Sequence, residues 1–315
     1  MKKCCLSILI IALTILCSAC KDDRVTKQGF FFDTVINITV DKKDLSAAED
    51  AFRICSEAED IFSRTKKGSE LSLLNSGESS ALSPDMEKVL DFSSTMFRIS
   101  GGAFDITVAP LIDLWDVKNR TVPPTLKEIE RARALTGFEK ITLSPFSLGG
   151  ATIDLGAVAK GYVADLIEKH FREKGIKNAI IDLGGNVHLI GEYTVGIRDP
   201  FNPDSLFAKI TLKDKSAVTS GSYQRYFEHD GKRYHHIIDP ATGNCANGGF
   251  SSVTVISPSS MHADALSTAI YILGEKGLSL AERFKDTEVF AIKENGEILT
   301  TDSFDESCIF EIIAN

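Results

Sequence analysis

The chain lacks the residues that would build a disulfide framework, a basic surface or a set of membrane-spanning helices. Its seven cysteines include only Cys55, Cys245 and Cys308 beyond the N-terminal segment, and their odd number and wide spacing fit neither disulfide pairing nor metal-ligand motifs. The formal charge of -9, with no basic stripe, argues against a nucleic-acid partner. No apolar run after the N-terminal segment is long enough to cross a bilayer.

The N-terminus is typical of an export signal. Lys2 and Lys3 precede the apolar run Leu6–Leu16, and small residues lead to Cys20. This pattern resembles a bacterial lipoprotein box, although Cys17 stands where Leu is usual. Residues 1–19 are therefore predicted to be a lipoprotein signal peptide. Lipid on Cys20 would anchor the protein to the inner membrane facing the periplasm, or elsewhere on the cell envelope. The alternative is a signal peptide that is cleaved without lipid or retained as an anchor.

Residues 20–315 are expected to form a single α+β domain with a mostly antiparallel sheet and inserted helices, since short strands joined by tight turns alternate with helical patterns and no low-complexity linker interrupts them. A capping box at Ser46 and Glu49 is predicted to begin one helix and Ser83-Pro84 another. Strands are expected at Val35–Val40, Ile141–Leu143, Ala151–Asp154, Ala179–Asp182, Thr194–Arg198, Phe207–Leu212 and Ser251–Ile256, and further helices at Val158–Lys174, Met261–Leu273 and Glu275–Phe284.

The segment from Tyr234 to Cys245 combines a proton carrier with a turn. His235 and His236 precede two isoleucines that are typical of a short buried strand, and Asp239-Pro240 then favours a turn whose amide groups face a ligand. A hairpin loop with a solvated histidine pair explains the same residues.

Two further segments place glycines after a strand. In the first, Gly156 permits a turn into a helix whose free amides, with Lys160, favour phosphate, although the spacing is not that of a P-loop. In the second, Gly184-Gly185 lie between Asp182 and Asn186. A plain hairpin accounts for the second segment nearly as well.

Asp264 and Thr268 are four residues apart, so they share one face of a predicted helix near its N-terminus. A carboxylate and a hydroxyl with nearby carbonyl groups form an oxygen site that suits Mg²⁺ or Ca²⁺. The alternative is that Asp264 only stabilises the start of the helix.

These segments occur in an order and spacing that resemble the FAD:protein FMN transferase family, also called ApbE. The resemblance rests on HHIIDPATG, IDLGAVAKGY, IDLGGN, TSGSYQRYF and HADALSTAIYILG, with upstream matches at Phe32-Asp33-Thr34, Ser69–Asn75 and Gly101–Thr107. It covers nearly the whole chain after the predicted signal peptide.

The resemblance implies a fold of duplicated T-fold-like halves and an enzyme that binds FAD and Mg²⁺, cleaves the pyrophosphate, transfers FMN to a Thr or Ser hydroxyl of a partner redox protein and releases AMP. Some relatives use water as acceptor, which gives FAD pyrophosphatase activity. His236 is then the candidate general base, and the implied metal ligands are Asp264, Thr268 and the carbonyl of Ala157. Implied flavin-dinucleotide contacts or their supports are Phe32, Thr65, Asp105, Lys160, Asp182, Gly184, Gly185, Asn186, Ser220, Gly221, Ile237, Asp239 and Thr242.

One position departs from the family pattern. Thr65 stands where many relatives carry a Tyr that covers the flavin ring, and a threonine cannot stack. Its small side chain leaves more room for water, so FAD hydrolysis is expected below transfer or alongside it. A flavin-binding or storage lipoprotein without turnover is the alternative of a different class, but pure binding would not need His236, Asp264 and Thr268. A structural envelope lipoprotein would explain none of the motifs.

Overall fold

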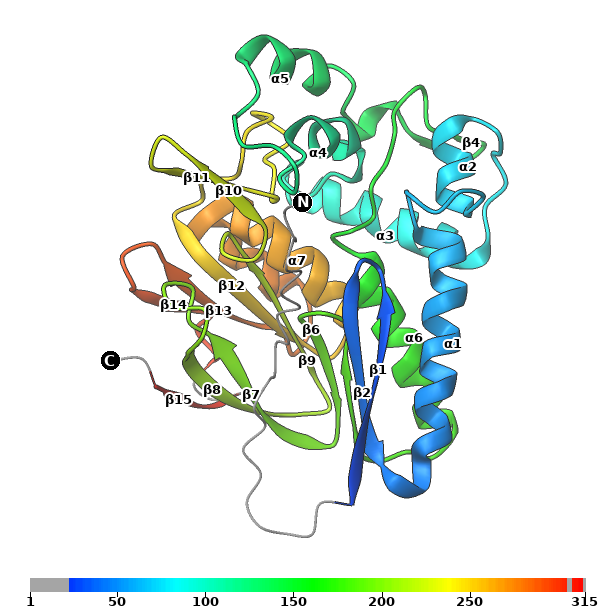
Figure 1. Cartoon of the computed structure of the whole chain (residues 1–315), viewed down its shortest axis with the longest axis vertical. Coiled ribbons are helices and arrows are strands. Elements are labelled where there is room, and N and C mark those ends of the chain that lie inside the picture. Colours follow the sequence, from blue (N-terminus) through cyan, green and yellow to red (C-terminus); the bar gives the residue numbers. More distant parts are fainter. Residues whose placement is uncertain (1–22, 305–307, 314–315) are drawn as a thin grey trace, which may run out of the picture.

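The computed structural model describes residues 23–304 and 308–313, so the predicted signal peptide and Cys20 lie outside the described residues. An eight-stranded sheet forms its centre (Figure 1), in the order β1-β2-β5-β6-β9-β12-β13-β14, and every neighbouring pair is antiparallel. The strands are β1 (Arg24–Phe31), β2 (Thr34–Asp41), β5 (Ala179–Asp182), β6 (Asn186–Ile190), β9 (Ser216–Gly221), β12 (Phe250–Ser257), β13 (Glu288–Lys293) and β14 (Ile298–Thr300).

Helices cover one face of this sheet and a smaller sheet covers part of the other (Figure 1). Alternate residues of β2, among them Ile36 and Ile38, enter the main core beneath the helices. A second core lies against the three-stranded sheet and includes Ile210 and Phe290. The helices are α1 (Leu45–Phe62), α2 (Glu70–Ser76), α3 (Pro84–Ile99), α4 (Ala109–Trp115), α5 (Leu126–Arg133), α6 (Ala159–Glu173) and α7 (Ser260–Leu273); the smaller sheet has the order β15 (Ile309–Ile312), β8 (Leu206–Lys213) and β7 (Glu192–Arg198).

The remaining elements are short. Two hairpins pair β3 (Thr142–Leu143) with β4 (Phe146–Ser147) and β10 (Tyr226–His229) with β11 (Lys232–His235), and 3₁₀ turns occupy η1 (Lys42–Asp44), η2 (Ile106–Val108), η3 (Phe138–Lys140) and η4 (Gly274–Arg283). The α+β class and the antiparallel sheet are confirmed. Whether the fold is duplicated stays a prediction. No helix in the described ranges is long and apolar enough to span a membrane.

Three local predictions are wrong. Residues 151–154 form no strand, because the Asn75 side chain accepts from the Ile153 amide at 2.8 Å and donates to its carbonyl at 2.9 Å, in place of a neighbouring strand. The capping box at Ser46 does not form, since Asp44 precedes the first helical residue without a side-chain cap. The two isoleucines after His236 are buried but make only one isolated bridge, between Ile238 and Cys245.

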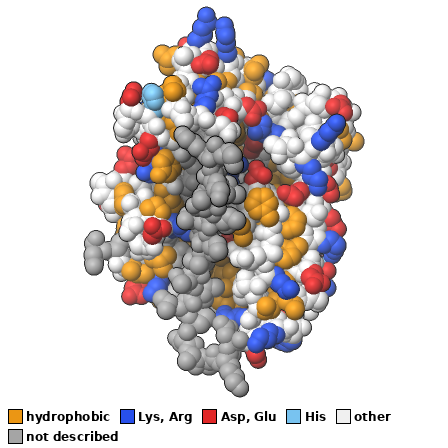
Figure 2. Space-filling view, in the orientation of Figure 1, with side chains coloured by type: hydrophobic (Ala, Val, Ile, Leu, Met, Phe, Trp, Pro, Cys, Tyr) orange, Lys and Arg blue, Asp and Glu red, His pale blue; other side chains and the backbone are white. Residues whose placement is uncertain are grey.

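The free cysteines agree with the sequence. Among the described residues Cys55, Cys245 and Cys308 are unpaired. Burial raises the pKa of the Cys245 thiol to about 11, so this thiol is not a reactive nucleophile at neutral pH. Acidic and basic side chains are interspersed over the face seen in Figure 2.

Candidate functional site

The glycine-rich turns and strand ends predicted to bind a ligand meet at one end of the eight-stranded sheet. Asn37 of β2 pairs with Asp182 of β5, and Asn186 of β6 pairs with Val218 of β9. The β1–β2 turn, the β5–β6 turn and the end of β9 are therefore neighbours, although they are far apart in the sequence (Figure 1).

The β5–β6 turn exposes main chain at this end. Asp182 Oδ1 accepts from the amides of Gly184 and Gly185, both at 3.0 Å. Gly184 has φ +72°, and a Cβ there would lie 2.4 Å from Thr34 Cγ2, so only glycine fits. Asp182 therefore shapes the loop, and the two exposed glycines present backbone to a ligand.

Asn186 begins β6 with its side chain unsatisfied. The residue is 4% exposed, yet its Nδ2 finds no hydrogen-bond partner within the described chain. A buried amide of this kind costs free energy unless something accepts from it. Its position fits the predicted contact with a polar ligand group.

The start of α6 is bound to α7 through Asp264. The Gly161 amide donates to Asp264 Oδ2 at 3.0 Å. Gly161 is the third residue of α6, whose N-cap is Val158, so its amide has no acceptor within the helix and Asp264 satisfies it. Asp264 is only 4% exposed. The Ala157 carbonyl, one residue before the N-cap, accepts no backbone hydrogen bond from the described residues. The family resemblance implies both groups as ligands.

Lys160 and Thr268 complete this cluster. Lys160 Nζ lies 4.0 Å from Asp264 Oδ2 and donates to the Gly156 carbonyl at 3.4 Å. Thr268 Oγ1 lies 3.4 Å from Ser220 Oγ, at the end of β9. Carboxylate, hydroxyl and carbonyl oxygens are the donors that Mg²⁺ prefers, so the residues present fit the predicted metal.

Gly161 and Asp165 hold the two helices in register. A Cβ on Gly161 would lie 2.4 Å from the Ser260 carbonyl oxygen, so α6 and α7 touch backbone to backbone there. One turn later, Asp165 accepts from the Ser260 amide at 2.6 Å and from the Ser259 hydroxyl at 2.7 Å, at the N-terminus of α7. Asp165 is not among the predicted site residues; its spacing of four residues from Gly161 is the signal in the sequence that could have pointed to it.

The candidate base His236 is held in one tautomer. Its Nδ1 lies 3.3 Å from the Arg225 carbonyl oxygen, which can only accept. Nδ1 therefore carries the proton, and Nε2 keeps a lone pair in the neutral ring. Burial lowers the pKa of His236 to about 3, with further contributions from the charges of Arg225 and Lys160. The ring is therefore neutral at ordinary pH.

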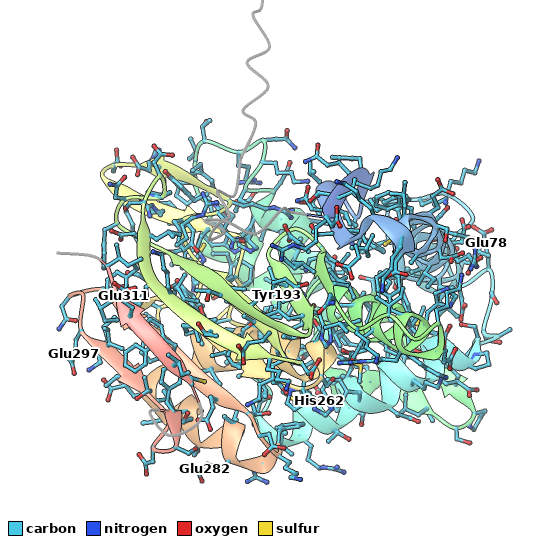
Figure 3. The ribbon with its side chains drawn as sticks, turned by 90° about the horizontal axis from the view of Figure 1, so that it is seen from below. Glu78, Tyr193, His262, Glu282, Glu297 and Glu311 are labelled. Carbon is cyan, nitrogen blue, oxygen red and sulfur yellow. The ribbon has the colours of Figure 1, made fainter. Side chains whose placement is uncertain are left out.

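His235 has a structural environment. Its Nε2 donates to the Ala246 carbonyl at 3.1 Å, and its Nδ1 accepts from the Ile237 amide at 3.3 Å. Both ring nitrogens are satisfied, and burial lowers the pKa of His235 to about 4. His262, labelled in Figure 3, is also structural, because its ring stacks on Phe92 and lies against Phe284.

Asp239 and Thr242 form the predicted turn by bonding to each other. Thr242 Oγ1 donates to Asp239 Oδ2 at 2.9 Å, and the Ala241 amide donates to Asp239 Oδ1 at 2.9 Å. Trp115 Nε1 donates to the Gly243 carbonyl at 2.7 Å. These two side chains therefore support the loop after Ile237, which is itself buried.

Three further residues that were predicted to contact the ligand lie in different surroundings. Asp105 is buried and accepts from the Thr107 amide and hydroxyl at 2.8 and 2.7 Å, so it orients its own loop. Thr65 is exposed, and its nearest polar contact is Ser63 Oγ at 3.5 Å. Gly221 is buried at the end of β9.

Phe32 occupies a strained turn at the tip of the β1–β2 hairpin. Phe32 and Asp33 have φ of +52° and +57°, a conformation that is unusual for a phenylalanine. The Phe32 amide donates to Glu59 Oε1 at 2.7 Å. Strain of this kind is common where a side chain is presented to a ligand.

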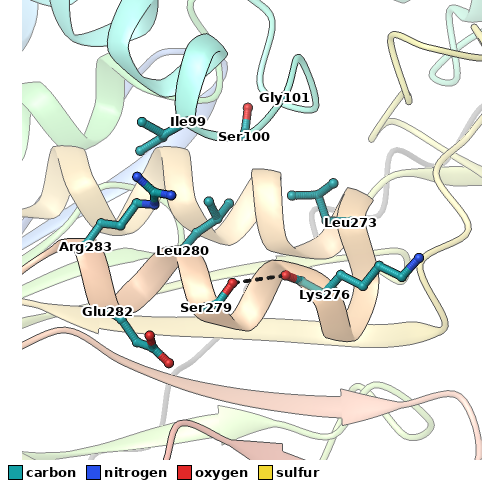
Figure 4. Close-up of a pocket in the computed structure, with 9 residues that line it drawn as sticks. All are labelled: Ile99, Ser100, Gly101, Leu273, Lys276, Ser279, Leu280, Glu282 and Arg283. Carbon is teal, nitrogen blue, oxygen red and sulfur yellow. Dashed lines mark hydrogen bonds between the residues drawn. The ribbon is translucent and has the colours of Figure 1, made fainter.

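A cavity of about 540 Å³ lies elsewhere, between the end of α3 and η4 (Figure 4). Its lining includes Ser100, Lys276 and Arg283 and none of the predicted site residues. The candidate site is thus defined by hydrogen bonding and by orphaned polar groups rather than by this cavity.

Comparison with known proteins identifies the family. The sequence model of the ApbE family matches residues 32–291. The chain belongs to the ApbE family. A FAD:protein FMN transferase of Klebsiella pneumoniae (strain 342) is 32% identical over 292 residues, covering 88% of this chain and 92% of that relative. A FAD:protein FMN transferase of Treponema pallidum (strain Nichols) is 34% identical, covering 78% and 77%.

Solved ApbE structures share the fold. The flavin transferase ApbE from Vibrio cholerae has a TM-score of 0.79 at 29% identity, over 90% of this chain and 98% of that one. The ApbE protein from Thermotoga maritima has a TM-score of 0.81 at 29% identity, with the same coverage.

Proposed function

We propose that this ApbE chain is a FAD:protein FMN transferase that cleaves FAD, attaches FMN to a Thr or Ser hydroxyl of acceptor proteins and releases AMP. The names of the relatives at 32% and 34% identity support the activity. The observation that carries the proposal is the bond from the Gly161 amide to Asp264, which fixes this buried carboxylate at the start of α6, 4.0 Å from the Lys160 ammonium. A flavin-binding protein without turnover would not need this arrangement.

The chain's own groups divide the work of pyrophosphate cleavage. Asp264, Thr268 and the Ala157 carbonyl would hold Mg²⁺, which neutralises phosphoryl charge and stabilises the leaving AMP when bound. Lys160 adds a fixed cation. The exposed backbone at Gly184 and Gly185 and the amide of Asn186 orient the dinucleotide. His236, protonated at Nδ1, accepts the acceptor hydroxyl proton at Nε2.

The exposed Thr65 supports some FAD pyrophosphatase activity. A threonine covers less of a flavin ring than an aromatic side chain, so water reaches the phosphoryl group more easily. We expect Thr65→Tyr to lower AMP release in the absence of acceptor while acceptor-dependent release persists, measured by chromatography of AMP. Equal acceptor-free release by both chains would remove Thr65 from this account.

The N-terminal sequence pattern supports a location on the cell envelope. With a lipid on Cys20, the enzyme would be anchored to the inner membrane facing the periplasm, or otherwise exposed on the envelope, where it would meet membrane-associated redox proteins. Mass spectrometry of the mature N-terminus tests this: a diacylglyceryl-modified Cys20 is expected, and an unmodified cleaved terminus would contradict it.

The metal assignment is tested by AMP release from FAD with Mg²⁺ and then with EDTA. Release that stops with EDTA and in Asp264→Asn, but continues in the surface control Asp286→Asn, is the expected result, because Asp264 supplies the only charged oxygen of the proposed set. Turnover by Asp264→Asn at the wild-type rate would contradict the assignment. Tight FAD binding with no AMP, even with acceptor present, would favour a carrier.

A further inference from the structure

A second group of potential ligands lies one helical turn beyond the Asp264 site. Asp165 and Glu168 are on α6, three residues apart on one face, and His188 is on the neighbouring strand β6. One ligand atom from each lies within 4.8 Å of the other two. Ligands of one ion at about 2.0–2.2 Å are at most roughly 4.4 Å apart, so shifts of a few tenths of an ångström suffice.

His188 is the observation that separates this cluster from an ordinary group of acids. The residue is 0% exposed. Its Nδ1 lies 2.7 Å from Ser216 Oγ on β9, which holds the ring in place. Its Nε2 is 3.2 Å from Glu168 Oε2, yet it forms no hydrogen bond with any described residue. A buried imidazole nitrogen that faces two carboxylates without hydrogen-bond geometry is in the position of a ligand.

The carboxylates are held as the ligands of a metal site usually are. Asp165 accepts from the Ser260 amide and the Ser259 hydroxyl, which fixes its orientation. Glu168 Oε1 accepts from Arg172 at 3.4 Å, so Oε2 faces His188. Arg172 also donates to Asp214 at 2.6 Å. Because Glu168 shares this cation with Asp214, the negative charge of Asp165 and Glu168 is not balanced by Arg172 alone.

We propose that Asp165, Glu168 and His188 bind a divalent transition-metal ion such as Zn²⁺, at a site separate from the Asp264 site. One imidazole nitrogen with two carboxylate oxygens suits Zn²⁺, Mn²⁺ or Fe²⁺ and disfavours Mg²⁺, which prefers oxygen alone. The Glu168 side chain is 25% exposed, which gives the ion an entry path and an open position for water. The ion would tie α6 to β6 and, through Asp165, to the N-terminus of α7.

The test is Zn²⁺ titration of the chelator-treated full chain by calorimetry, with excess Mg²⁺ present to occupy the oxygen site. We expect one equivalent of Zn²⁺ to bind, binding to weaken by more than ~10-fold in Glu168→Gln, and binding to be retained in Asp264→Asn. Glu173→Gln, on the same helix and ion-paired with Lys169, is the matched control and should bind normally.

X-ray absorption of the Zn²⁺-loaded wild-type chain adds a readout that needs no variant, and one imidazole among otherwise oxygen ligands is expected. No Zn²⁺ binding, unchanged binding by Glu168→Gln, loss of binding in Asp264→Asn, or an all-oxygen ligand shell would each overturn the proposal. The first of these would leave His188 and Glu168 as a close side-chain contact without a metal. FAD turnover is not measured, so failure here leaves the proposed transferase activity untouched.

Discussion

At the scale of single residues, two adjacent histidines have opposite roles because of what their ring nitrogens contact. His235 has both nitrogens bonded inside the protein, whereas His236 gives Nδ1 to the Arg225 carbonyl and keeps the Nε2 lone pair. The sequence could name His236 as the base only through family resemblance, since the order of the two residues says nothing about which ring is satisfied. The tautomer comes from the fold.

His236→Asn is expected to lower the rate of FMN transfer by ~10²–10⁴-fold with little change in FAD affinity. Asparagine can still donate to the Arg225 carbonyl but has no basic nitrogen. Single-turnover kinetics and flavin fluorescence titration measure the two quantities, with His229→Asn as the control. A variant that loses FAD affinity while transferring at the normal rate would make His236 a binding residue.

His235 should make the fold sensitive to acid. Its pKa of about 4 in the folded protein lies below the usual value near 6.5. Above pH 6.5 the ring is neutral in both states and has no effect. As the pH falls below 6.5 the unfolded chain gains a proton that the folded chain excludes, so stability declines until the pH approaches 4. This contribution amounts to roughly 2 kcal/mol between pH 7 and 5.

Denaturant unfolding at pH 7 and 5 measures this loss, and His235→Gln is the comparison because its amide can replace the bond to the Ala246 carbonyl without titrating. The variant should lose less stability than the wild type over this interval. An equal loss in both proteins would assign the acid sensitivity to other groups.

At the scale of elements, the tip of the β1–β2 hairpin links backbone strain to ligand binding. Phe32→Ala should raise the KM for FAD by roughly 2- to 10-fold, the range for losing one aromatic contact, if the strained turn presents this ring to the flavin. Asp33→Ala, in the same turn with an exposed side chain, should leave the KM unchanged. Steady-state kinetics measure the KM for FAD of each variant. Equal KM values for Phe32→Ala and wild type would show that Phe32 does not contact the flavin.

Local sequence signals predicted the elements that depend on local chemistry. The Ser83 cap of α3 forms as expected, and Thr125 forms a capping box at the start of α5, because each cap bonds to an amide three residues away. The prediction of a strand at residues 151–154 is wrong because this backbone depends on a distant residue. It is hydrogen-bonded by the side chain of Asn75, 78 residues earlier in the chain. The sequence Asp-Leu-Gly occurs at residues 154–156 and 182–184 and forms the same turn in both places, since Asp154 and Asp182 each accept from the glycine amide two residues on.

At the scale of the whole molecule, the antiparallel sheet explains why distant motifs act together. The family resemblance predicted which segments matter, and the strand order places those at the ends of β2, β5, β6 and β9 at one end of the sheet. No pattern in the sequence predicted that the Gly161 amide would donate to Asp264, because that bond depends on the packing of α6 against α7. The site is therefore a property of the assembled fold.

The central claim is that this assembled site transfers FMN from FAD to a protein hydroxyl. The most direct measurement is the intact mass of a Thr-containing flavoprotein subunit from the same cells, after incubation with the chain, FAD and Mg²⁺. The account predicts a gain equal to FMN less water, with one AMP released per FMN attached, and no gain with EDTA or with Asp264→Asn. AMP released without any change in the mass of the acceptor would contradict transfer and leave hydrolysis as the activity.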